Sequence, residues 1–386
     1  MPTNRRIFCA QAATLLLSRG MPALQISHAS TSRPDVAAID HDRIVEAGEK
    51  YLKEAPVSLV ALPCKRSPGG LHDFYSEADG SEAFTAHRDA LLGFSIQASA
   101  LASAYVLTKQ ESYAEQALRH LRTWFVDSAT RMTPSLVYAQ TVPPAKEGRP
   151  EGIVETVHLA EVAQSIPFLA SSDVMTGADR EGLQSWFASY LEWLTNSRLA
   201  GLARDQKNHH GSSWLLQTVA FNRLILSLNP NANDAGLNEL RQQYKRVTIR
   251  AQIVADGTFP HELSTVNPYR LSLFNLDMLA AICLLLSTRF ESVWDYDLQD
   301  GPGMRAAMAR YFPYIRNRGT WPYVADAKYF DSLPLRQPSL LFAAKAYTRP
   351  EYADLWRTLP ADTDVPELQR TFPIRQPLLW VTTPKL

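Results

Sequence analysis

Helical periodicity recurs along almost the whole chain beyond about residue 33, and it limits the possible folds more than any other feature. Apolar residues recur at three- and four-residue spacing, which is typical of packed helices. The predicted helices cover residues 86–108, 112–125, 155–169, 179–196, 213–228, 237–253, 271–287, 303–311 and 338–346. Pro, Gly, Asn and Asp fill the connections, and no several-residue stretch alternates as a strand does. The pattern predicts an all-α fold.

Size and charge set further limits. The chain has 386 residues, 46% of them hydrophobic, and no formal net charge. It can therefore bury a large core, and no linker composition divides it, so we predict a single domain over residues 30–386. Residues 143–150, which are rich in proline, are expected to form a loop over a cleft. A neutral chain argues against nucleic acid as a partner, whereas a local basic cleft could still bind an anionic sugar polymer.

The N-terminus has the layout of an export signal. The pair Arg5-Arg6 precedes a mostly apolar run to Leu24, and a small-x-small site follows at residues 27–29. The arginine pair also fits a twin-arginine signal, which would export a folded protein. We therefore expect removal of residues 1–29 and a periplasmic or secreted location. No later segment has the uninterrupted apolar length of a membrane span, so none is expected.

Two cysteines, Cys64 and Cys283, would remain after removal of the signal. They could pair in an oxidising compartment, but nothing in the sequence requires it. Cys283 lies in an apolar run, which favours a buried structural thiol.

Two polar clusters carry the chemistry. The first reads Lys207-Asn208-His209-His210-Gly211 and opens directly onto an apolar helix; its simplest interpretation is that Asn208 and the histidines cap that helix. The second runs from Asp256-Gly257 to Asp277. The histidines are adjacent rather than at the helical spacing that places two imidazoles on one metal, and no phosphate loop is present. We expect no metal and no cofactor.

The two clusters resemble motifs of the alginate-lyase-like domain family of polysaccharide lyases. Members of that family often read Lys-Asn-Asn-His-Gly at the first cluster and Asp-Gly-x-Phe-Pro-x-Glu-Leu at the second. The resemblance continues in order through residues 69–77, 86–88, 138–140, 155–159, 321–323 and 336–338. It implies an α/α toroid of antiparallel helical hairpins, and an enzyme that cleaves a uronic-acid-containing polysaccharide, such as alginate or glucuronan, by β-elimination.

Such a reaction removes a proton beside a carboxylate, so the site must neutralise that carboxylate and supply a base and an acid. The resemblance assigns carboxylate neutralisation and proton transfer to His209 and His210. Family members have an Asn where this chain has His209. Because the amide is displaced, Asn208 is a further catalytic candidate.

The second cluster departs from the family at two positions. Thr265 and Leu271 stand where related sequences have an Arg and a Tyr. Tyr269 and Arg270 supply the missing residue types, and we predict Tyr269 as catalytic if the backbone there is a loop. In a helix, a shift of two residues would turn the side chain by about 200°, away from the site. An aromatic-rich stretch that the family often has after residue 77 is also missing.

Nine residues are predicted to bind substrate: His72, Tyr75, Arg88, Tyr138, Gln140, Lys207, His261, Glu262 and Arg270. Simpler interpretations stay open for several of them. His72 could bond to the backbone, Arg88 could be a solvated residue at a helix start, and Glu262 could form a structural salt bridge. His158, on an apolar helix face, is expected to be a satisfied core histidine.

An exported lyase acting on an anionic polysaccharide is the leading hypothesis, and two alternatives remain. A glycoside hydrolase on an α/α toroid would need two carboxylates about 5–5.5 Å or about 6.5–9.5 Å apart. Asp73, Asp256 and Glu262 are its candidates. A non-catalytic sugar-binding relative is the second alternative, because Thr265 and Leu271 are chemically silent.

Overall fold

The computed structural model describes residues 34–229, 231–299 and 301–384, and from Arg33 onward the chain packs as one unit. The predicted export signal over residues 1–29 lies outside the described residues. The division of the chain at residue 29 stays a prediction.

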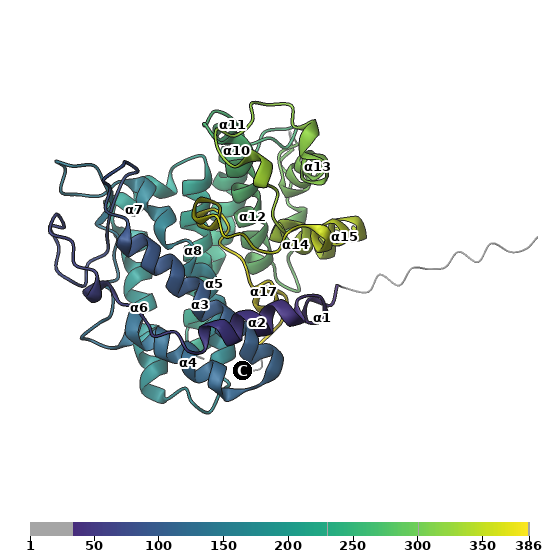
Figure 1. Ribbon diagram of the computed structural model, residues 1–386. Coiled ribbons are helices and arrows are strands. Elements are labelled where there is room, and N and C mark those ends of the chain that lie inside the picture. Colours follow the sequence, from purple (N-terminus) through teal and green to yellow (C-terminus); the bar gives the residue numbers. More distant parts are fainter. Residues whose placement is uncertain (1–33, 230, 300, 385–386) are drawn as a thin grey trace, which may run out of the picture. The chain divides into compact units, whose positions relative to one another are not determined.

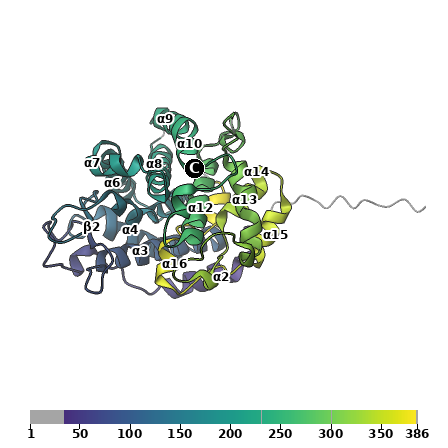
Figure 2. The same cartoon turned by 90° about the horizontal axis from the view of Figure 1, so that it is seen from above.

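Five helices pack side by side in chain order and form the centre of the fold (Figures 1 and 2). They are α3 (Ala86–Thr108), α5 (Leu159–Leu169), α8 (His209–Leu228), α12 (Pro268–Leu286) and α14 (Pro338–Ala346). Buried residues occur all around α12 and over most of α5, α8 and α14. Each inner helix is apolar on several faces because it has protein neighbours on several sides.

Outer helices cover this inner row. They are α2 (His41–Tyr51), α4 (Glu111–Leu121), α6 (Gly177–Asn196), α9 (Ala235–Gln243), α13 (Met304–Arg316) and α15 (Pro350–Thr358). The outer helices α2 and α4 pack on α3, α6 and α9 pack on α8, and α13 and α15 pack on α14. Each buries one face and leaves the other exposed. Inner and outer helices in antiparallel hairpins make the predicted α/α toroid, which is confirmed.

Several shorter elements connect these helices. The α-helices are α1 (Val36–Ile39), α7 (Arg198–Arg204), α10 (Ile249–Gln252), α11 (Pro260–Leu263), α16 (Pro366–Arg370) and α17 (Leu378–Val381). The 3-10 and π turns are η1 (Leu59–Ala61), η2 (Arg122–Val126), η3 (Pro150–Thr156), η4 (Tyr244–Thr248), η5 (Val293–Asp295), η6 (Arg318–Thr320) and η7 (Phe330–Ser332).

The structure corrects several predicted helix boundaries: α8 and α12 begin at His209 and Pro268, before the predicted starts at 213 and 271, and α13 runs to Arg316, past the predicted end at 311. A 3-10 turn, η3, replaces the start of the predicted helix 155–169, and π turns end α4 and separate α9 from α10. Two strands, β1 (Tyr75–Glu77) and β2 (Tyr138–Thr141), pair in parallel with Tyr75 opposite Tyr138. Three or four residues are too few for an alternating pattern to be recognised.

Two helices, α3 and α12, are long and apolar enough to cross a membrane, contrary to the prediction from the sequence. In their most apolar windows, 67% of α3 and 89% of α12 is buried within the protein. Their composition is therefore explained by their place in the inner row. Cys283, on α12, is a buried free thiol as expected, and Cys64 is also free.

Candidate active site

A pocket of about 700 Å³, part of it open to solvent, lies where the first turns of the inner helices meet the C-terminal segment. The start of α3, the turn η3, the start of α8 and the start of α12 each contribute residues to its wall. The remaining wall comes from the loop after β1, from β2 and from α16. Segments that are distant in the sequence therefore share one site.

The start of α8 supplies the histidines. Asn208 is the N-cap: its side-chain oxygen accepts hydrogen bonds from the His210 backbone N–H and from His210 Nδ1, both at 3.1 Å. Because an amide oxygen only accepts, His210 Nδ1 must carry a proton, which leaves Nε2 with a free lone pair. Burial holds the pKa of His210 well below its usual range, and the neighbouring His209 and Arg149 act in the same direction. His210 is thus a neutral imidazole at the pocket wall.

Glycine is required directly after these histidines. A side-chain carbon at Gly211 would lie 2.2 Å from the backbone oxygen of Gln206. The tight approach of the preceding turn to the helix explains why the motif ends in glycine.

His209 is held by a buried carboxylate from the second cluster. Glu262 is fully buried on α11, and it accepts hydrogen bonds from the His209 backbone N–H at 2.5 Å and from His209 Nδ1 at 2.9 Å. The two hydrogen bonds to one carboxylate fix the position of His209 and the orientation of its ring. The rings of His209 and His210 lie 4.1 Å apart between centroids, so both imidazoles sit at the same point of the pocket. We call Asn208, His209, His210 and Glu262 the histidine side.

The start of α12 decides where the substitute residues point. Pro268 is its first residue, and the carboxylate of Asp326 accepts the backbone N–H of Tyr269 at 2.7 Å and of Arg270 at 2.9 Å. This cap makes the segment helical from its first turn. Arg270 and Leu271 consequently line the pocket, whereas Tyr269 points away.

Tyr269 lies in the core. It is fully buried, its ring packs against Trp321 and Phe330, and its hydroxyl donates to the backbone oxygen of Tyr314 at 3.0 Å. Burial raises its pKa far above the usual range for a phenol. The predicted catalytic role does not fit this position, because the helical rotation carries the side chain to the far side of α12.

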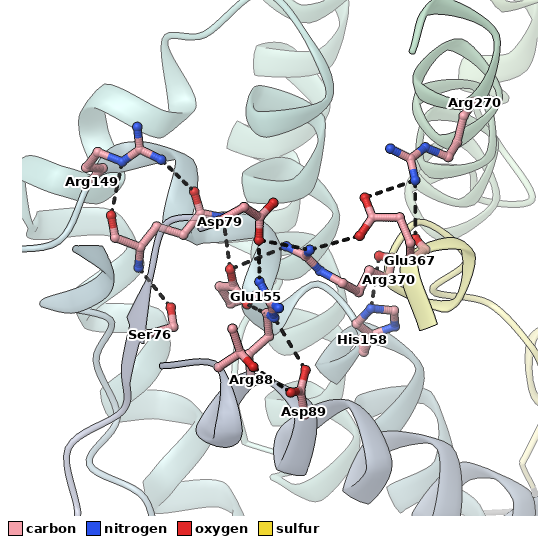
Figure 3. A network of polar contacts seen from close by, with 12 residues as sticks. Ser76, Asp79, Arg88, Asp89, Arg149, Glu155, His158, Arg270, Glu367 and Arg370 are labelled. Atoms are coloured by element: carbon pink, nitrogen blue, oxygen red, sulfur yellow. Dashed lines mark hydrogen bonds and ion pairs between the residues drawn. The ribbon is translucent and has the colours of Figure 1, made fainter. Parts of the chain in front are cut away.

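Three arginines and three carboxylates form a further part of the wall, in alternation (Figure 3). Arg88 contacts Asp79 at 3.1 Å, and Arg370 lies 3.6 Å from the same carboxylate. Glu367 lies between two arginines, 3.2 Å from Arg370 and 3.0 Å from Arg270. Glu155 lies 3.9 Å from Arg88 and 3.8 Å from Arg370. We call these six residues the arginine side.

The carboxylates of the arginine side differ in their environments. Burial raises the pKa of Glu155, and the nearby Arg370 and Arg88 only partly oppose it. Gln140 donates to its Oε1 at 2.9 Å, while Oε2 is buried without a hydrogen-bond partner among the described residues. Burial would also raise the pKa of Asp79, but Arg370 and Arg88 outweigh it and lower the value. Glu155 is therefore the carboxyl group best able to hold a proton in the pocket.

Comparison with known proteins assigns the chain to a family. The sequence model of the family described as "Alginate lyase" matches residues 33–321. The chain belongs to the alginate lyase family. Its members are polysaccharide lyases, so this chain is a polysaccharide lyase. No curated protein sequence matched.

Solved structures of alginate lyases share the fold. An alginate lyase from Bacteroides ovatus is 24% identical, with a TM-score of 0.74 over 88% of this chain and 93% of that one. Alginate lyase A1-III from Sphingomonas species A1 is 15% identical, with a TM-score of 0.52 over 81% of this chain and 88% of the enzyme. A histidine variant of that enzyme, complexed with a tetrasaccharide, has a TM-score of 0.52 at 14% identity, over 88% of this chain and 94% of its own.

The pocket of this lyase brings together five of the residues predicted from the sequence. They are Arg88, Gln140, His209, His210 and Arg270. Asn208 and Glu262 hold the two histidines by hydrogen bonds, so the interpretation of Asn208 as a helix cap is confirmed, and its catalytic role stays a prediction. His158 also borders the pocket, but both of its ring nitrogens are occupied, by the Arg370 carbonyl at 3.2 Å and by Arg375 at 3.4 Å.

Five other predicted substrate contacts lie outside the pocket. The Tyr75 hydroxyl is buried and donates to Glu77 at 2.6 Å, and the His72 ring bonds to the backbone oxygen of Arg131 at 2.9 Å. Tyr138 packs close to Gly69, and Lys207 and His261 are exposed to solvent elsewhere. Hydrogen bonding and strand pairing direct the side chains of His72, Tyr75 and Tyr138 away from the pocket.

The carboxylates proposed for a hydrolase do not converge. Asp73 accepts the backbone N–H of Gly70 at 2.7 Å, Asp256 bonds within its own turn to Thr258, and Glu262 is paired with His209. Each has a local structural partner, and none of the three lines the pocket. Within the described residues, no group of three His, Cys, Asp or Glu side chains could hold a metal ion.

Four pocket residues were missed. Glu155 lies in a segment that carried the family resemblance, but its role was not recognised. Asp79, Glu367 and Arg370 had no such signal, and the last two lie beyond the part of the chain that the family model matches. The spacing of Glu367 and Arg370 on a Pro-initiated turn could have indicated an i,i+3 ion pair, but not its place in the pocket.

Proposed function

We propose that this lyase cleaves a polymer rich in uronic acid by β-elimination, with residues of both the histidine side and the arginine side acting at the bond that is cleaved. The observation that carries the proposal is the neutral His210, whose free Nε2 lies at the wall of a pocket that three arginines also line. The arginines can bind a polyanionic substrate, and the neutral imidazole can act as the base that removes a proton from carbon.

His210 is the proposed base. It removes the proton from the ring carbon that bears the carboxylate, the bond from the adjacent carbon to the glycosidic oxygen breaks, and a carbon–carbon double bond forms between the two carbons. The Nδ1 hydrogen bond to Asn208 keeps Nε2 unprotonated before the reaction and orients the ring.

Arg270 and His209 are the proposed partners of the substrate carboxylate. Withdrawal of charge from this carboxylate makes the neighbouring proton acidic enough to remove. Arg270 is nearly buried, and His209 is backed by the carboxylate of Glu262. Both can therefore act in a region of low dielectric, where the interaction is stronger than in water.

Glu155 is the proposed acid. The departing glycosidic oxygen must gain a proton, and a phenol is not available because Leu271 lines the pocket while Tyr269 lies in the core. Glu155 offers a carboxyl group whose pKa is raised by burial and whose Oε2 has no hydrogen-bond partner among the described residues. After one turnover His210 releases its extra proton to solvent, and Glu155 takes up a proton from solvent.

Export remains part of the proposal. An exported enzyme would encounter such polymers outside the cytoplasm, and the basic and apolar layout of residues 1–29 fits an export signal. Cell fractionation followed by N-terminal sequencing of the mature protein would test it. A protein found in the cytoplasm with residues 1–29 intact would refute export.

The decisive experiment mixes the purified protein with alginate, polymannuronate, polyguluronate and glucuronan and follows ultraviolet absorbance. Alginate is the first choice because the structurally similar enzymes are alginate lyases. A β-elimination creates a conjugated double bond that absorbs, whereas hydrolysis gives reducing ends without absorbance. Reducing ends alone would refute the proposed reaction, and binding without either product would indicate a sugar-binding protein.

A further inference from the structure

The carboxylate of Glu367 occupies a position between two arginines. Its Oε1 accepts from Arg270 Nη1 at 3.0 Å, and its Oε2 accepts from Arg370 Nη1 at 3.2 Å (Figure 3). One carboxylate thus bridges two guanidinium groups at the pocket wall. A uronate carboxylate has the same geometry and charge and would meet the same donors.

The three partners differ in exposure. The side chain of Arg270 is 6% exposed and that of Arg370 is 20% exposed, whereas that of Glu367 is 37% exposed. Glu367 can therefore turn toward water more readily than either arginine. Leaving Arg270 without a carboxylate is unfavourable, because an uncompensated buried charge has lost its hydration. The exit of Glu367 is thus favourable only when another anion takes its place.

The helix that carries Glu367 is itself fixed. Leu368 is 1% exposed, and the backbone oxygen of Arg370 accepts a hydrogen bond from His158 at 3.2 Å. Exchange at this point therefore requires only rotation of the Glu367 side chain and no movement of α16.

We propose that Arg270 and Arg370 form a carboxylate-binding subsite that Glu367 fills in the empty enzyme, and that a uronate carboxylate displaces it. Binding is then an exchange of one carboxylate for another. Neutral sugars cannot replace Glu367, so the subsite selects for anionic chains. Arg370 becomes a binding residue supplied by the C-terminal segment, beyond residues 33–321. The inference rests on the proposed substrate class, and it adds Arg370 and the exchange with Glu367 to the carboxylate contact proposed for Arg270.

The test compares affinities of the wild type and Glu367→Gln for tetramers of mannuronate and of glucuronate by titration calorimetry, in a His210→Ala background that prevents turnover. Removal of the competing carboxylate should tighten binding about 3- to 5-fold, the size expected for one partly exposed ion pair. The gain should shrink as salt is raised. Arg370→Gln should weaken binding.

Glu351→Gln is the matched control, since it removes the same charge from an exposed pair with Arg349 on α15. It should leave binding unchanged. Neutral cellotetraose should gain nothing from Glu367→Gln. If thermal denaturation shows that Glu367→Gln is misfolded, Glu367→Asp retains the charge with a shorter reach and should give a smaller gain.

Unchanged or weaker uronate binding by folded Glu367→Gln would overturn the inference, as would an equal gain for cellotetraose. Absence of binding to every uronate tetramer in both proteins would overturn it too. The wild type assayed for absorbance reports separately on the reaction. Tighter binding by the variant with no absorbance from the wild type would leave the subsite standing and refute the lyase mechanism.

Discussion

The histidine side and the arginine side of the pocket differ in how tightly their side chains are held. On the histidine side, Asn208 and the fully buried Glu262 hold two rings through hydrogen bonds of 2.5–3.1 Å. On the arginine side, contacts of 3.0–3.9 Å join the buried Glu155 and Arg270 to the more exposed Arg88, Glu367 and Arg370. Short buried bonds fix a tautomer and an orientation, whereas longer ion pairs can change partners. The two residues proposed for proton transfer, His210 and Glu155, come one from each side.

Loss of His210 should have the largest effect. His210→Ala removes the proposed base and should lower kcat by about 10²–10⁴-fold, the usual contribution of a positioned proton acceptor. Steady-state absorbance kinetics on the best polymer measures it. His41→Ala, which removes an exposed histidine on α2, is the control and should match the wild type. A His210→Ala enzyme with normal kcat would remove the histidine side from the chemistry.

Glu155→Gln should come next. The amide retains the shape but has no acidic proton, so kcat should fall by about 10²-fold. In the wild type, activity should decline as pH rises through the raised pKa of Glu155, because the proton donor is lost; this alkaline limb should be absent from the variant. The check is a pH profile of kcat.

Asp79→Asn is the matched control for Glu155. Asp79 contacts the same two arginines, but its pKa is lowered, so it carries no proton to donate near neutral pH. Its alkaline limb should remain but move to lower pH, because the charge of Asp79 contributes to the raised pKa of Glu155. An alkaline limb unchanged in Glu155→Gln would assign the donor to another group.

Glu262→Gln tests the rigidity of the histidine side. The backbone N–H and Nδ1 of His209 each bond to a different oxygen of Glu262, and the amide of glutamine has only one oxygen to accept them. The loss of one buried charge-assisted bond should lower the free energy of unfolding by about 1.5–3 kcal/mol. Urea denaturation monitored by circular dichroism measures it, with Glu239→Gln on the exposed part of α9 as control. A stability equal to that of the wild type would mean that the buried pair is not a structural anchor.

Tyr269→Phe should have the smallest effect. The variant loses only the hydrogen bond to the Tyr314 backbone, which should lower stability by about 1 kcal/mol and leave kcat within about 3-fold of the wild type. The same kinetic and denaturation assays apply. A collapse of kcat with normal stability would contradict the core position of Tyr269 and restore the catalytic role predicted from the sequence.

Much of the fold could be predicted from local patterns. The predicted ranges 86–108 and 338–346 coincide with α3 and α14, because apolar spacing and, for α14, a proline at the first position are properties of neighbouring residues. The motif Asn208-His209-His210-Gly211 marked one wall of the pocket for the same reason: the cap, the rings and the tight turn are consecutive. Strands of three and four residues carry too little pattern and were missed.

The sequence by itself determined the helical architecture, the family and the position of the histidines. Only the tertiary structure decided which second-cluster residues face the pocket, because Asp326, far along the chain, caps α12 and turns Tyr269 inward. It alone placed Glu155, Glu367 and Arg370 beside Arg88 and Arg270. Periodicity reports the burial of a residue within its own helix, whereas charge complementarity across a pocket depends on contacts between segments that the sequence keeps hundreds of residues apart.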